Sequence, residues 1–115
     1  MRYLILIHTQ EAPWAALDGA EQQKWMQAYI DYVTDLRNRD KLVESAQLEL
    51  SSGAKQVTVV NGKRTVVDGP FADTKEQVGG FFLVEAENEA EAIELAAACP
   101  GAHHGRVELR KLRAR

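Results

Sequence analysis

Residues 3–7 read YLILI and residues 81–84 read FFLV, and both runs are apolar at every position. A strand with one wet face alternates apolar and polar residues, whereas a strand covered on both faces is apolar throughout. The two runs therefore predict the central strands of one sheet, and the rest of the fold is built around them.

Two capping boxes mark the starts of two helices. Asp18 with Glu21 begins one, and Asn88 with Glu91 begins the other, because these side chains bind N–H groups that the first turn leaves unpaired. The first helix carries an apolar stripe at three- and four-residue steps, which predicts that it packs on the sheet. The residues of this stripe are Trp25, Tyr29, Tyr32, Val33 and Leu36. The second helix is expected to end near Pro100, since the residue before a proline avoids helical geometry.

A β-hairpin is predicted between the helices. Residues 57–60 and 63–67 flank the pair Asn61-Gly62, which accepts the positive φ angles of a two-residue type I′ turn. A looser strand at 42–50 precedes this hairpin, and a strand at 105–111 follows the second helix. This order predicts an α+β fold: a ferredoxin-like split βαβ sandwich with an antiparallel sheet, two helices on one face and an inserted β-hairpin. The length of 115 residues fits a single domain over 1–115.

The open face of this sheet needs a cover. Two helices cover one face only, yet the central runs are apolar on both. We expect the uncovered face of a second copy to pack against the uncovered face of the first, so that a homodimer encloses a cavity. Ligand sites would then lie between sheet and loops.

Composition excludes several classes of protein. The net charge of −3 argues against a nucleic-acid binder. The basic end, from Arg106 onward, predicts an edge strand with a solvated exit, the alternative being an anion contact. Cys99 is the single cysteine, which excludes an intramolecular disulfide and predicts a reduced, half-buried thiol. The apolar run at 3–7 is too short for a signal peptide and nothing approaches a membrane span, so a cytoplasmic protein is expected.

Residues 67–81 read VDGPFADTKEQVGGF, which strongly resembles the DGPF-domain proteins of the YCII-related family. The resemblance extends over essentially the whole chain and implies a dimeric α+β barrel of ferredoxin-like halves. Most such proteins have no assigned reaction. In the wider family, which includes proteins that look like small dehydrochlorinase or isomerase-like enzymes, the resemblance implies a His and Asp acid-base pair. The His is expected on the first helix, where this chain has Tyr29. Relatives encoded beside, or fused to, extracytoplasmic-function sigma factors imply an accessory or sensing role.

Three residues are candidates for proton transfer. Asp68 is a carboxylate at a strand end that would project into the dimer cavity; the alternative is a structural Asx-type turn. His8 follows the first central strand and is the best local partner for Asp68, the alternative being a satisfied histidine at a strand end. Tyr29 can donate a proton or bind a ligand, although its place on the apolar stripe favours the core.

Two further residues are weaker ligand-binding candidates. Lys75 can hold an anionic ligand as a point charge, with solvent as the favoured alternative. Phe71 can contact a ligand, although a role as a core plug is favoured. No metal site and no cofactor is predicted, because the chain lacks a P-loop, a Ser-His-Asp order and a metal motif. His103 and His104 would point to opposite sides of an extended chain.

The leading hypothesis is a small-molecule enzyme or ligand binder whose Asp68 handles a proton in a dimer cavity. The alternative is a non-catalytic accessory or regulatory module that binds a protein partner such as an extracytoplasmic-function sigma factor. The sequence predicts neither a nucleic-acid nor a membrane partner.

Overall fold

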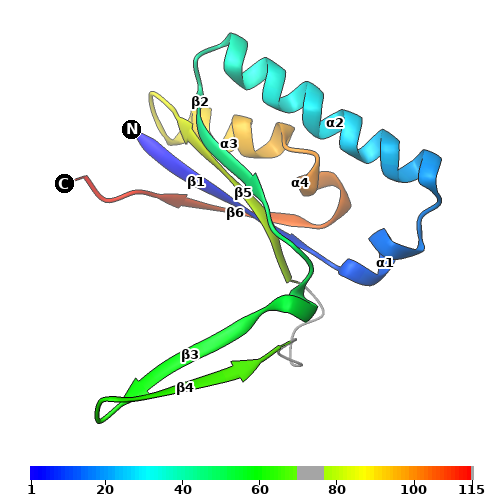
Figure 1. The fold of residues 1–115 in the computed structure, drawn as a ribbon. Helices are drawn as coiled ribbons and strands as arrows, with labels where there is room; N and C mark the ends of the chain where they lie inside the picture. The colour runs from blue at the N-terminus through cyan, green and yellow to red at the C-terminus, as the bar shows by residue number, and fades with distance from the viewer. Residues whose placement is uncertain (70–76, 115) are drawn as a thin grey trace.

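The computed structural model describes residues 1–69 and 77–114. Figure 1 shows an antiparallel sheet with helices on one face, and a hairpin that projects away from it. The strand order in the sheet is β2-β5-β1-β6. Its strands are β2 (Leu42–Gln47), β5 (Gln77–Glu85), β1 (Arg2–Thr9) and β6 (Arg106–Lys111). The predicted ferredoxin-like α+β sandwich is therefore confirmed.

The two apolar runs form the central strands, as predicted. Strands β1 and β5 pair antiparallel, with Ile5 opposite Phe82. Their helix-facing side chains are buried, and they alternate with half-buried side chains on the opposite face. The buried set comprises Tyr3, Ile5, Ile7, Phe82 and Val84.

Both long helices begin where the sequence places them. Helix α2 spans Gly19–Asn38 and helix α3 spans Glu89–Ala98. The Asp18 carboxylate accepts a bond of 2.8 Å from the Glu21 N–H, and the Asn88 side chain accepts one of 2.9 Å from the Glu91 N–H. A complete capping box also needs the glutamate side chain to accept a hydrogen bond from the N–H of the capping residue, and among the described residues neither glutamate does so. The Glu91 carboxylate instead accepts from the Glu87 N–H, and the Glu21 carboxylate pairs with Lys24.

Three short elements were not predicted from the sequence. They are α1 (Glu11–Ala16), the 3₁₀ turn η1 (Ser51–Gly53) and α4 (Gly101–His104). Because α4 is helical, the prediction of extended chain at His103 and His104 is wrong. His103 lies 2.9 Å from the Ala97 carbonyl oxygen, whereas the His104 ring stacks on Trp25 at 3.7 Å. The two imidazoles thus have separate partners.

The hairpin forms as predicted. Strand β3 spans Lys55–Val60 and strand β4 spans Lys63–Asp68, and together they make a separate two-stranded sheet. Asn61 and Gly62 have φ angles of 53° and 76°, which fit the type I′ turn. Every residue of both strands is exposed.

The core lies between the sheet and the long helices. The Tyr32 hydroxyl donates a hydrogen bond of 2.6 Å to the Leu95 carbonyl and joins α2 to α3. Cys99 is completely buried, so the prediction of a half-buried thiol is wrong: helix α3 ends with this residue turned into the core. Burial raises the pKa of its thiol to about 11.

The chain is flatter and more extended than its mass requires. Its radius of gyration is 16.2 Å and its extents are 46 × 44 × 19 Å, whereas a compact domain of this length has a radius near 13 Å. Its accessible surface is 8309 Å², against about 6,300 Å² for a compact monomer of the same mass. About 2,000 Å² of extra surface is therefore exposed, and Figure 1 shows that the projecting hairpin contributes to it. Within the described ranges, the helices are all too short or too polar to span a bilayer.

Candidate functional site

The sheet has one face that no helix covers in the described part of the chain, and we call it the open face (Figure 1). Its centre is apolar, because Leu4 opposes Leu83 and Leu6 opposes Phe81 across β1 and β5. All four side chains are only half-buried. The open face therefore presents an apolar floor of two leucine-containing cross-strand pairs.

A histidine and a carboxylate meet at the edge of this floor. His8 Nε2 lies 3.1 Å from Glu108 Oε1, and Arg110 Nη1 lies 3.3 Å from Glu108 Oε2. The hydrogen bond with His8 and then that with Arg110 hold the pKa of Glu108 below its usual range, so this carboxylate stays charged at neutral pH. The His8 side chain is 16% exposed. An imidazole oriented by a carboxylate and still reachable from outside is the arrangement that general acid-base chemistry uses.

A β-bulge in strand β5 lies opposite His8. The pairing of β1 with β5 shifts between Ile7 and His8: Ile7 opposes Gly80, but His8 opposes Val78, so Gly79 is the extra residue. Such bulges bend a strand and re-aim side chains. Glycine suits both positions here, since Gly79 is the bulged residue and a Cβ at Gly80 would stand 2.7 Å from the Ala46 carbonyl oxygen.

Asp68 lies away from this pair, at the end of hairpin strand β4. Its side chain is 78% exposed, and its Oδ1 accepts a bond of 2.6 Å from the Lys55 ammonium across the hairpin. Among the described residues, Lys55 rather than a loop N–H is its donor. Both the proton-transfer role and the Asx-turn role predicted for Asp68 stay predictions.

Tyr29 lies on the other side of the sheet from His8. Its ring stacks parallel to Phe82, at 6.2 Å and 8°, and its hydroxyl lies close to Gly101. Burial, with a smaller contribution from Cys99, raises the pKa of this phenol. Within one chain the structure thus separates the three proton-transfer candidates. Phe71 and Lys75 lie outside the described residues.

Comparison with known proteins identifies the family. The model of the YCII-related domain matches residues 1–114. The chain belongs to the YCII-related family.

Two matches of this YCII-related chain are informative. An uncharacterised protein of Rhizobium meliloti (strain 1021) is 30% identical over 96 residues, which is 84% of this chain and 77% of that protein. Among solved structures, the 5-chloro-2-hydroxyhydroquinone dehydrochlorinase of Burkholderia phenoliruptrix AC1100, in complex with 2,5-dihydroxybenzoquinone, superposes with a TM-score of 0.58. That match covers 100% of this chain and 96% of the dehydrochlorinase, at 17% identity. At this identity the likeness shows a shared fold.

Sequence reasoning missed Glu108 and Arg110 of the YCII-related domain. Arg110 was interpreted as part of a basic end with a solvated exit, and Glu108 was given no role. The signal was present in the alternation of Val107, Glu108, Leu109 and Arg110, which places the two charged residues on one face of the last strand. The alternation alone does not show which strand pairs with the last strand, so the contact of Glu108 with His8 could not be predicted.

The described residues offer no ready metal centre. Across 1–69 and 77–114, His, Cys, Asp and Glu side chains nowhere gather in a group of three or more that could hold an ion.

Proposed function

We propose that this YCII-related protein is a small-molecule enzyme or ligand-binding protein that works as a homodimer. The open faces of two copies enclose the ligand, and His8 with Glu108 exchanges a proton with it. The observation that carries the proposal is the His8–Glu108 pair of 3.1 Å beside the apolar floor of the open face.

The surface of the chain supports the dimer. A standard protein interface buries about 800 Å² on each partner, and the chain exposes about 2,000 Å² more than a compact monomer of its mass. The apolar floor is part of this surface, and a second copy of the same floor matches it in polarity.

The sequence predicted Asp68 as the leading proton-transfer residue, whereas this proposal gives that role to His8 and Glu108 and makes Asp68 a second carboxylate. Because it sits on the projecting hairpin, it enters the cavity as a second carboxylate brought by that arm. Its exposure of 78% leaves it free to exchange Lys55 for a ligand group. Exchanging Asp68 for Asn keeps the shape and removes the charge, so it separates the proton-transfer role from the turn role.

A flat, acidic ring compound is the ligand class to test first. The structural neighbour was solved with 2,5-dihydroxybenzoquinone, and such a ring suits an apolar floor bordered by an imidazole that can donate to a ring oxygen. Isothermal titration with 2,5-dihydroxybenzoquinone should give binding that His8→Gln and Glu108→Gln each weaken about tenfold. Glu94→Gln is the matched control, since Glu94 is an exposed carboxylate on α3. Equal affinities for all variants would remove His8 and Glu108 from the site.

The alternative proposal is an accessory module whose open face binds a protein such as an extracytoplasmic-function sigma factor. The uncovered apolar floor favours it, since the same surface suits a protein partner. Sedimentation equilibrium of the isolated chain decides between the two. We expect a dimer that Leu6→Asp dissociates and that Ile30→Asp, on the exposed side of α2, leaves intact. A monomeric wild-type chain would contradict the homodimer and favour the accessory role.

A further inference from the structure

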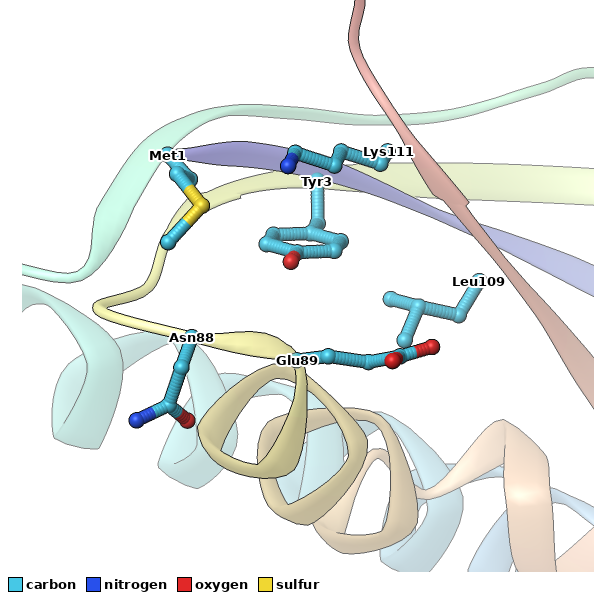
Figure 2. A pocket seen from close by; sticks show the side chains of 6 residues that line it. All are labelled: Met1, Tyr3, Asn88, Glu89, Leu109 and Lys111. Carbon is cyan, nitrogen blue, oxygen red and sulfur yellow. The ribbon is translucent and has the colours of Figure 1, made fainter.

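A hollow lies on the helix-covered side of the sheet, at the end where α3 begins (Figure 2). Its volume is about 380 Å³, within the range of about 300–1,000 Å³ that small-molecule sites occupy. It is lined by Met1, Tyr3, Asn88, Glu89, Leu109 and Lys111. Tyr3 opposes Lys111 across β1 and β6, on the face opposite to His8. We call this hollow the Tyr3 pocket.

Tyr3 has a buried ring and an unpartnered hydroxyl. The residue is 4% exposed, and its hydroxyl has no hydrogen-bond partner among the described residues. No buried side-chain oxygen or nitrogen in the described ranges lacks a partner, so this hydroxyl is reached by solvent. The Tyr32 hydroxyl, by contrast, is already bound to the Leu95 carbonyl at 2.6 Å. Figure 2 shows the Tyr3 oxygen directed into the pocket, where a bound molecule can accept a hydrogen bond from it in place of water.

Two opposite charges line the same pocket without pairing. Within the described part of the chain, neither Lys111 nor Glu89 forms an ion pair. Their charged neighbours do form pairs, since the Met1 ammonium binds Glu85 at 3.2 Å and Lys41 binds Glu91 at 2.8 Å. Figure 2 shows the Lys111 chain running toward Met1 and the Glu89 chain running toward Leu109. The ammonium and the carboxylate thus lie toward different ends of the pocket.

We infer that the Tyr3 pocket binds a small zwitterion with a short apolar body. The carboxylate of the zwitterion pairs with Lys111 and accepts a hydrogen bond from the Tyr3 hydroxyl. Its ammonium pairs with Glu89, and its body packs against the Tyr3 ring and Leu109. This site is separate from the open face and does not depend on the function proposed for His8.

The test uses 4-(aminomethyl)benzoate as the probe, a flat ring with a carboxylate at one end and an ammonium at the other. Benzoate and benzylamine each carry one of the two charges. Isothermal titration should show that the zwitterion binds at least tenfold more tightly than either, because each charged contact adds affinity. Lys111→Met and Glu89→Gln should each weaken the zwitterion about tenfold, and Tyr3→Phe about fivefold.

Matched variants separate the pocket from general effects of charge. Lys63→Met, on the exposed hairpin, and Glu94→Gln, on α3, should leave the affinity unchanged. Tyr3→Phe should keep the melting temperature, since the hydroxyl has no partner to lose among the residues that the structure describes. His8→Gln should also bind the zwitterion with unchanged affinity. The pocket can therefore be tested even if the open-face proposal fails. Equal affinity for zwitterion, benzoate and benzylamine, or equal losses in Lys111→Met and Lys63→Met, would overturn the inference.

Discussion

Gly80 of strand β5 lies against the backbone of strand β2. A Cβ atom at this position would stand 2.7 Å from the Ala46 carbonyl oxygen, a backbone atom held by the sheet. The adjacent strands would have to separate, so Gly80→Ala should lower the free energy of unfolding by about 1–3 kcal/mol. Urea unfolding followed by circular dichroism measures this change. Gly53→Ala is the control, because nothing lies within 4 Å of its Cβ; similar losses in both variants would contradict the argument.

Cys99 predicts a dependence of stability on pH. Its pKa in the folded chain is raised from 9.0 to about 11, chiefly by burial. The unfolded state therefore loses this proton first, and the stability contributed by the neutral thiol is lost as the pH rises from about 9 to about 11. Between pH 8 and pH 10 the wild type should lose about 1 kcal/mol more than Cys99→Ala. Urea unfolding at both pH values measures this difference, and parallel losses would show that the thiol titrates normally.

At the scale of the element, each long helix depends on one capping side chain. Asn88 binds the Glu91 N–H at 2.9 Å at the start of α3. Asn88→Ala leaves that donor without its partner and should cost about 1 kcal/mol of unfolding free energy. Glu94→Ala, at an exposed position within the same helix, should cost less than about 0.5 kcal/mol. Thermal unfolding of the two variants checks the difference; if Glu94→Ala costs as much, the cap contributes nothing specific.

The elements that sequence reasoning found are those with a local signal. The apolar runs, the caps at Asp18 and Asn88 and the turn at Asn61-Gly62 each lie within a few residues of sequence, and all of them formed. Helix α4 was missed because four residues after a proline carry too short a pattern to read.

The candidate site was harder to predict because its contacts are not local. His8 and Glu108 are 100 residues apart in the chain, and only the register of β1 with β6 makes them diagonal neighbours. Sequence alone pointed to His8 and to Asp68, but not to Glu108, and it could not show that Asp68 belongs to a projecting arm. Register and the direction of the hairpin are set by packing among distant segments.

At the scale of the whole molecule, two sites are proposed on opposite sides of one thin sheet. The open face places an imidazole–carboxylate pair beside an apolar floor. The Tyr3 pocket places two charges, unpaired within the described ranges, beside the Tyr3 hydroxyl. The sheet itself separates the pocket from any cover that the open face receives. Ligands at the two sites should therefore bind without competing.

The extra surface of the chain predicts that its stability depends on concentration. If two copies bury the open face, unfolding also separates them, so the melting temperature rises with protein concentration. An unfolding enthalpy of about 0.7 kcal/mol per residue over both chains gives a rise of about 3 °C for each tenfold increase. Differential scanning fluorimetry over two decades of concentration measures this slope. Leu6→Asp, on the apolar floor, should abolish it, whereas Ile30→Asp, at a position 54% exposed on α2, should keep it. A flat curve for the wild type would mean that the floor stays uncovered by a second copy, because a self-association strong enough to hide it cannot be independent of mass action.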